Sequence, residues 1–256
     1  MINIKSIFAM LAVMSLCAFS FFQQQPAITI AAAADLKFAM DSIIASYKAQ
    51  NPGAEVQVIY GSSGNFFQQI TNGAPFDIFF SADVDYPNKL KDQGLTVGNI
   101  KTYGIGQIVL WSKKTDPNKE RMNTLLEANI KKIATADPSH APYGKRARES
   151  LQYYKLYDKI HDKLVLGENI SQTAQFVTTG AADIGVVALS LALSPAMKSE
   201  GGKYYLIPEE SHTPLEQAYT MLKHASGNST AAKFYNFISS HAAIDVLKYY
   251  GFSQKK

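Results

Sequence analysis

The sequence predicts an α/β protein with two lobes, each built on a β-sheet with helices on its faces. Strand-like and helix-periodic segments alternate along the chain, beginning with strand–turn–helix units at 28–47 and 54–71. The alternation continues through the second half without a linker of distinct composition. Hydrophobic residues make up 46% of the chain, enough for a sizeable core. This order is typical of mainly parallel sheets covered by helices.

The first unit begins with the β-branched run Ile28–Ile30, followed by four alanines. Apolar residues then recur at the i, i+3, i+4, i+7 spacing of one helix face, up to Tyr47. Asp35 stands where the N-cap of this helix is expected. A strand that feeds a helix through small residues leaves N–H groups free at the positive end of the helix dipole. We therefore expect a generic anion site here.

Later segments repeat this unit. A strand at 54–60 ends in the Gly-Ser-Ser-Gly-Asn turn, 61–65, before a helix, and a strand at 130–136 enters the two-proline loop 137–144 before another helix. The other expected elements are strands at 76–81, 105–112, 183–192, 204–207 and 215–222, a loop or short strand at 95–103, and helices at 86–93, 122–128, 145–157, 171–180, 231–240 and 243–250.

The strands at 105–112 and 215–222 are placed to cross between the two lobes. This makes the first lobe discontinuous, and we expect lobe I at 28–106 plus 216–256 and lobe II at 107–215. The order and length of the segments support this division.

The N-terminal segment has the composition of a secretory signal peptide. Lys5 supplies the positive charge, 7–22 is apolar apart from two serines, and the chain turns polar at 23–27. We expect residues 1–24 to be removed, with the cleavage site between 20 and 27. Cys17 is the only cysteine, and bulky Leu16 before it disfavours a lipid anchor. The mature chain then has no cysteine for disulfides, zinc–thiolate sites or nucleophilic catalysis.

Charge and motifs favour a binding protein over an enzyme or a nucleic-acid partner. The formal net charge is +4, and its basic residues are dispersed without an aromatic stacking pattern. Residues 61–64 depart from the nucleophile-elbow pattern, and the five histidines lack metal-ligand spacing. Asp77 and Asp83 are expected as solvated turn residues. A secreted hydrolase stays an alternative that needs a histidine within reach of Ser63.

Small polar residues recur where helices begin, at Asp35, Ser63, Tyr143 and Ser171. Each serine or aspartate taken alone is explained as a helix cap. Together they predict a cleft lined with N–H and O–H donors and without formal positive charge.

Several stretches resemble the periplasmic molybdate-binding proteins of molybdate ABC transporters. They are AAAADLKFAM, YGSSGNFFQQITNGAPFDIFFSAD, ATADPSHAPYGKRARESL, ENISQTAQFVTTGAADIGVV and AAIDVLKYYGF. The resemblance implies a type II periplasmic-binding-protein fold whose lobes close on molybdate or tungstate, contacted through its oxygens, without a cofactor or a bare metal cation. It also implies a periplasmic location and a membrane permease as partner. We expect a monomer.

The resemblance places the oxyanion ligands at Asp35, Ser63, Tyr143, Ile170 and Ala188, with Ile170 as a backbone N–H donor. Two positions depart from the family pattern. Asp35 replaces a hydroxyl ligand, and Ala188 replaces a strand-end tyrosine of some relatives, which leaves Ser190 as the nearby substitute.

Asp35 raises a question of charge. An ionised carboxylate about 4 Å from an anion costs roughly 4 kcal/mol at an effective dielectric of 20. Three arrangements avoid this cost: the side chain turns away to cap the helix, the carboxyl group is protonated, or the ligand brings a proton, as phosphate does. We expect the first. The third leaves phosphate as an alternative ligand, beside sulfate and a small organic acid that Arg146 would pair.

Overall fold

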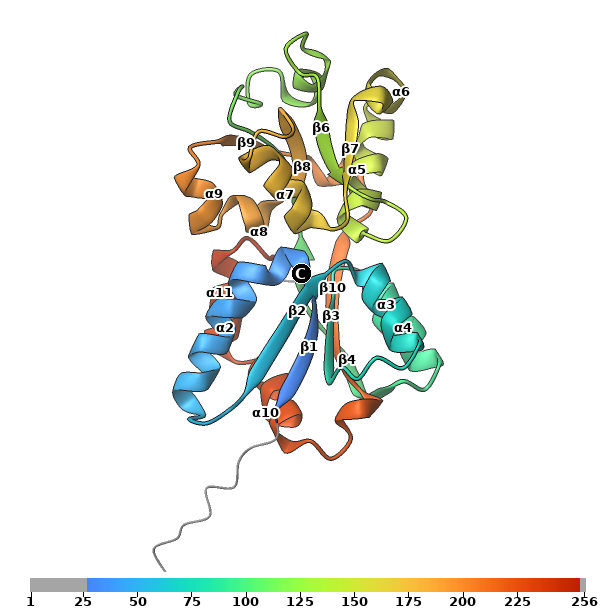
Figure 1. Cartoon of the computed structure of the whole chain (residues 1–256), viewed down its shortest axis with the longest axis vertical. Coiled ribbons are helices and arrows are strands. Elements are labelled where there is room, and N and C mark those ends of the chain that lie inside the picture. The colour runs from blue at the N-terminus through green and yellow to red at the C-terminus, as the bar shows by residue number, and fades with distance from the viewer. Residues whose placement is uncertain (1–26, 254–256) are drawn as a thin grey trace, which may run out of the picture.

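The computed structural model describes residues 27–253 of the 256-residue chain. Two five-stranded sheets, each with helices around it, form two lobes stacked along the long axis (Figure 1). The expected signal peptide 1–24, its cleavage site and Cys17 lie outside the described residues. Within 27–253, none of the helices has the length and apolar character needed to span a membrane.

The first sheet has the strand order β2-β1-β3-β10-β4. Its strands are β1 (Ile28–Ala33), β2 (Val56–Gly61), β3 (Ile78–Ser81), β4 (Thr96–Gly106) and β10 (Leu215–Leu222). The helices of this lobe are α2 (Lys37–Gln50), α3 (Ser63–Thr71), α4 (Asp85–Asp92), α10 (Ser229–Phe237) and α11 (His241–Tyr249), with 3-10 turns η1 (Ala34–Leu36) and η5 (Lys223–Ala225).

The second sheet has the order β7-β6-β8-β5-β9. Its strands are β5 (Ile108–Ser112), β6 (Ile133–Ala136), β7 (Leu164–Gly167), β8 (Ile184–Ala188) and β9 (Lys203–Leu206). The helices of this lobe are α5 (Pro142–Tyr153), α6 (Tyr157–Ile160), α7 (Ile170–Thr178), α8 (Leu189–Ala192) and α9 (Pro195–Ser199), with 3-10 turns η2 (Arg121–Leu126), η3 (His161–Lys163) and η4 (Glu209–Ser211).

Both sheets are mixed, whereas the sequence led us to expect mainly parallel ones. β1 is parallel to β2 and β3, and β6 is parallel to β7 and β8. β10 runs antiparallel to β3 and β4, and β5 runs antiparallel to β8 and β9. The reason is that β5 and β10 each enter a lobe from the other one, against the direction of the strands that end at the interlobe face.

Several element boundaries differ from the expected ones. The segment 105–112, expected as one strand, divides at Gln107 between β4 and β5, and 183–192 becomes β8 followed by the short helix α8. The segment 95–103 belongs to the eleven-residue strand β4, because β10 supplies a long antiparallel partner. The segment 122–128 forms the 3-10 turn η2. Apolar runs predict buried segments but not where pairing ends.

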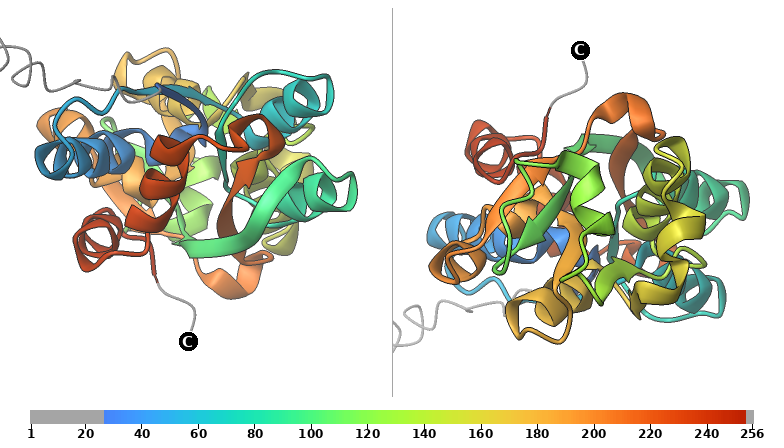
Figure 2. Two further views of the ribbon diagram at one scale, coloured as in Figure 1. Left: turned by 90° about the horizontal axis from the view of Figure 1, so that it is seen from below. Right: turned by 90° about the horizontal axis from the view of Figure 1, so that it is seen from above.

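Alternating side chains of β1 pack on opposite faces of the first sheet. Ile28 and Ile30 join a core formed with α2, α10 and α11, whereas Ala31 joins Phe66 and Leu90 of α3 and α4. Views along the long axis show α2 and α11 on one side of this sheet and α3 and α4 on the other (Figure 2). The carboxyl ends of β1, β2 and β3 therefore meet at the interlobe face between two helical layers.

Candidate functional site

The strand-to-helix turns of both lobes meet around a small interlobe cavity. Its lining residues are Ala33, Ala34, Asp35, Gly61, Ser62, Ser63, Ala82, Ala141, Pro142, Tyr143 and Ile170. The cavity measures about 10 Å³, about the space that one water molecule needs. It lies beyond the carboxyl ends of parallel strands, the usual ligand position in α/β sheets. None of these lining residues carries a positive charge.

The structure brings together Asp35, Ser63, Tyr143 and Ile170 in this lining. Ala188, the fifth expected ligand, is not part of it. Ala188 is fully buried at the end of β8, where it pairs with Ile108. The expected role of Ala188 therefore has no support in this geometry, because β8 ends beside the cavity and not at its wall.

Asp35 does not cap α2, contrary to our expectation. The chain passes through the turn η1 before α2 begins, so the N-cap position falls on Leu36, without a side-chain cap bond. The Asp35 side chain is 1% exposed, and its Oδ2 accepts a hydrogen bond of 2.9 Å from the hydroxyl of Tyr143. Its Oδ1 has no hydrogen-bond partner within 27–253. Burial raises the pKa of Asp35 to about 6, although donors from Gln217 and Tyr143 partly oppose this.

A buried chain of hydrogen bonds continues from Asp35 to β4. The Tyr143 hydroxyl accepts from Nε2 of Gln217 at 2.9 Å, and Oε1 of Gln217 accepts from the hydroxyl of Tyr103 at 2.5 Å. Burial raises the pKa values of Tyr143 and Tyr103 well above the usual value of a tyrosine, so both hydroxyls remain neutral donors. The sequence did not indicate Gln217 or Tyr103, because long-range strand pairing brings them here.

Ser63 is the first residue of α3 and is fully buried. Its Oγ accepts a hydrogen bond of 3.0 Å from the backbone N–H of Ala82. Within the described chain its hydroxyl proton has no acceptor, and the N-cap position of α3 falls on Ser62 and not on Ser63. Ser63 is thus held in place through its oxygen and keeps a donor to offer in the cavity.

Three helices, α3, α5 and α7, begin at the cavity. In α7 the side chain of Asn169 accepts from the N–H groups of Ser171 and Gln172, at 3.0 Å each. The N–H of Ile170 is not used by this cap and has no acceptor within its own helix. In α5 the first residue is Pro142, so Tyr143 supplies the first N–H group.

Two serines that we expected as caps or ligands instead join the lobes. Ser171 Oγ donates to the carbonyl of Ala34, and Ser190 Oγ donates to the carbonyl of Asp35, both at 2.8 Å. The N–H of Gly64 donates to the carbonyl of His140 at 2.9 Å. A Cβ at Gly64 would lie 2.5 Å from that carbonyl oxygen, so this close approach requires glycine.

His140 comes within reach of a serine, as the hydrolase alternative required, but the serine is Ser62. Nδ1 of His140 lies 2.9 Å from Ser62 Oγ. Nε2 lies 3.7 Å from Asp137 and 4.0 Å from Glu168, too far for the hydrogen bond that orients a catalytic histidine. The geometry therefore gives the hydrolase alternative no support.

The other charged candidates lie outside the cavity lining. Arg146 contacts Glu149 at 2.7 Å and Asp83 at 3.5 Å, so an organic acid in the cavity would find no guanidinium. Asp77 and Asp83 are buried and not solvated, because their carboxylates accept backbone N–H groups from β1 and the start of α4. These aspartates have structural roles.

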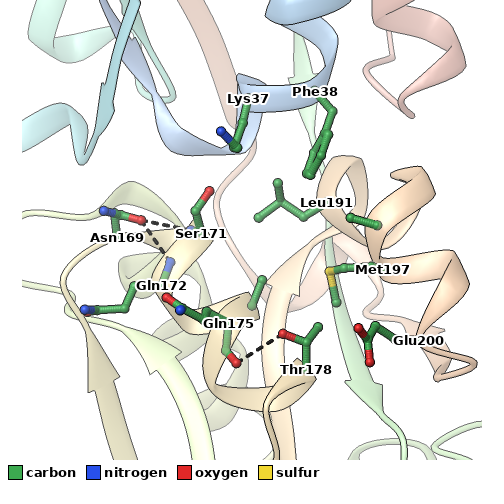
Figure 3. Close-up of a pocket in the computed structure, with 12 residues that line it drawn as sticks. Lys37, Phe38, Asn169, Ser171, Gln172, Gln175, Thr178, Leu191, Met197 and Glu200 are labelled. Atoms are coloured by element: carbon green, nitrogen blue, oxygen red, sulfur yellow. Dashed lines mark hydrogen bonds between the residues drawn. The ribbon is translucent and has the colours of Figure 1, made fainter.

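A second, larger interlobe groove of about 440 Å³ lies between α2 and the helices α7–α9 (Figure 3). Lys37 and Phe38 face it from α2, and Leu191, Met197 and Glu200 face it from the other lobe. Of the helix-start residues expected to line the cleft, only Ser171 lines this groove, and its hydroxyl donates to the carbonyl of Ala34. Its walls mix polar and apolar side chains, and its volume is far larger than that of the cavity at the helix starts, so it encloses a small oxyanion less well.

Comparisons with known proteins agree with this architecture. Residues 28–253 match the profile of the family described as bacterial extracellular solute-binding protein. The chain is 35% identical over 205 residues to the molybdate-binding protein ModA of Rhodobacter capsulatus, covering 79% of each protein. It is 34% identical over 230 residues to ModA of Azotobacter vinelandii, covering 90% of each.

Among solved structures, the periplasmic molybdate-binding protein of Azotobacter vinelandii is similar with a TM-score of 0.82 and 29% identity, over 90% of this chain and 100% of that one. The two-lobed α/β fold and the resemblance expected from the sequence are thereby confirmed. This chain belongs to the bacterial extracellular solute-binding protein family, and the molybdate-binding proteins ModA are among its relatives.

Proposed function

We propose that this protein captures molybdate, and tungstate as an anion of the same shape, in the periplasm and delivers it to the permease of an ABC transporter. The observation that carries the proposal is the convergence of three helix starts on one buried cavity. Helix starts bind oxyanions through free N–H groups and the positive end of the dipole. Relatives at 34% and 35% identity are named molybdate-binding proteins, which supports the same ligand here.

The proposed ligand groups are the hydroxyl of Ser63, the N–H groups of Tyr143 and Ile170, and the turn at Asp35. Among residues 27–253, the hydroxyl of Ser63 and the N–H of Ile170 have no acceptor, and both residues line the cavity. We leave Ala188 out of this set, because it does not line the cavity. Ser190 is also left out, because its hydroxyl donates to a backbone carbonyl.

Capture requires the lobes to move apart and close again. A tetrahedral oxyanion is larger than one water molecule, so the cavity of about 10 Å³ must widen to admit it. The chain crosses between the sheets at Gln107 and again after β9. We propose lobe I at 28–106 plus 216–256, lobe II at 107–215, and hinge motion at these crossings. The permease then distinguishes the closed, loaded form.

The remaining features follow from this role. The protein has no catalytic activity of its own and needs no cofactor, because capture uses hydrogen bonds alone. It acts as a monomer without nucleic-acid binding and reaches the periplasm after removal of a signal peptide at 1–24. Mass spectrometry of the exported protein tests the removal of the signal peptide, and sedimentation tests whether the protein is a monomer.

Calorimetric titration of the purified protein with molybdate, tungstate, sulfate and phosphate tests the ligand. We expect saturable heat at one site for molybdate and tungstate, and none for sulfate. Binding of sulfate alone, or of no oxyanion, contradicts the proposal. Phosphate is the second candidate, and the carboxyl group of Asp35 in the cavity favours it, because hydrogen phosphate has a proton to donate there.

A further inference from the structure

Asp35 places a carboxyl group inside the cavity where the anion is proposed to bind. The side chain is 1% exposed, and its two oxygens differ. Oδ2 is held by the Tyr143 hydroxyl at 2.9 Å, whereas Oδ1 has no partner among the described residues although it is buried. An unpartnered buried oxygen is costly and calls for a proton or a donor.

Within 27–253, hydrogen-bond donors but no cations face Asp35: the side chains of Gln217 and Tyr143 and the backbone N–H groups of Asp35 and Leu36 lower its pKa by less than burial raises it. The ionisable ones are the hydroxyls of Tyr143 on α5 and Tyr103 on β4, both kept neutral by burial. From α8 and α7 the neutral hydroxyls of Ser190 and Ser171 approach the η1 turn.

The charged side chains on the neighbouring elements have other partners: Lys37 with the Tyr60 ring, Arg146 with Asp83 and Glu149, Lys145 with Tyr86, and Glu216 with Thr102. Gln217 on β10 contributes an amide donor and no charge. An incoming oxyanion therefore meets Asp35 without an intervening cation in the cavity lining.

An ionised carboxylate only accepts hydrogen bonds, and so do the oxygens of a fully deprotonated oxyanion. Two such groups in contact repel each other unless a proton lies between them. We propose that one proton is shared between Oδ1 of Asp35 and an oxygen of the bound anion, so that each molybdate captured takes up one proton from solution. This inference rests on the proposed function.

The geometry allows this arrangement without breaking an existing bond. Oδ2 keeps the hydrogen bond from Tyr143, and Oδ1, protonated, donates to the anion. Burial raises the pKa of Asp35 to about 6 even without a ligand, and a dianion beside the carboxyl group raises it further. Hydrogen phosphate reaches the same arrangement by bringing the proton itself, so its capture takes up none.

Titration calorimetry in several buffers at pH 8 counts the protons, because the observed heat varies with the ionisation enthalpy of the buffer in proportion to proton uptake. We expect an uptake close to one per molybdate or tungstate, and close to zero for phosphate if it binds. The molybdate association constant should fall about tenfold per pH unit between pH 7 and 9.

Variants separate Asp35 from other sources of protons. In D35S and D35N, which keep a donor at this position, molybdate should bind with no proton uptake and a flat pH profile; thermal unfolding confirms that both are folded. D41N is the matched control on an exposed aspartate of α2 and should keep an uptake of one. Wild-type binding of molybdate without proton uptake overturns this inference and leaves the proposed function standing. Absence of binding for every oxyanion overturns both.

Discussion

Tyr143 of α5 donates its hydroxyl proton to Oδ2 of Asp35 across 2.9 Å, and this bond joins the two lobes inside the cavity. The same hydroxyl accepts a hydrogen bond from Nε2 of Gln217, so it connects α5, the η1 turn and β10. The same two residues were expected from the sequence as ligands of one anion. Because they contact each other directly, the stability of the closed form of the cleft depends on the carboxyl group of Asp35.

Removal of the Tyr143 hydroxyl should weaken this connection more than it weakens anion binding. In Y143F the Oδ2 atom of Asp35 and Nε2 of Gln217 lose a buried partner, which costs about 1–3 kcal/mol of unfolding free energy. The N–H of residue 143 remains for the anion. Urea denaturation measures the loss, and Y153F on the exposed side of α5 is the control expected to match wild type. Unchanged stability of Y143F would contradict the proposed network.

Substitution of Ser63 tests the ligand set. S63A removes the only side-chain hydroxyl donor that we assign to the anion, and binding should weaken by about 1–3 kcal/mol. Titration calorimetry measures this change. T71A, at the exposed end of the same helix, should bind like wild type. Wild-type affinity in S63A means that the anion binds elsewhere.

Gly64 tests whether affinity depends on closure. In G64A the new Cβ meets the carbonyl oxygen of His140 at 2.5 Å and the hydroxyl of Tyr86 at 2.9 Å, so the lobes are held apart. We expect at least tenfold weaker molybdate binding and a larger radius of gyration by small-angle scattering with ligand present. Q68A, exposed on α3, should behave like wild type. If G64A is as compact as wild type and binds molybdate as tightly, the close contact between Gly64 and His140 has no role in affinity.

Asp35 should make the ligand-free protein less stable as the pH rises. Its pKa in the folded chain is about 6, above the ordinary value of 3.8 for an aspartate, so the folded state holds a proton that the unfolded state releases. The stabilisation is therefore full below about pH 4 and is lost as the pH rises through 6, by roughly 3 kcal/mol in total.

Denaturation at pH 5 and pH 8 checks this sign. D35N, without an ionisable group, should be more stable than wild type at pH 8 and should lose this component of the pH dependence. Asp183 changes the free energy of unfolding in the opposite direction and in a more acidic pH range. Burial opposes ionisation of its carboxyl group, but Lys114 and two backbone N–H groups lower its pKa to about 2. Greater stability of the wild type at pH 8 than at pH 5, with no change in D35N, would contradict the role of Asp35.

Local patterns predicted the elements that depend on neighbours in the chain. The alternation in β2 and the helical period after Asp35 appear where expected, because they reflect backbone preference and burial of one face. The helix α5 begins at Pro142, inside the loop expected at 137–144. The boundaries at Gln107 and Ala188 were missed, since a continuous apolar run looks the same whether it stays in one strand or turns into a helix.

By itself the sequence determined the α/β class, the strand–turn–helix units and the approximate positions of the helices that follow β1, β2 and β6, because these follow from short-range spacing. Only the tertiary structure decided that Asp35 faces Tyr143 and does not cap its helix, that Gln217 and Tyr103 support this pair, and that Ala188 lies outside the cavity. Those contacts join residues that are distant in sequence, and their geometry follows from how the two sheets pack across the interlobe face.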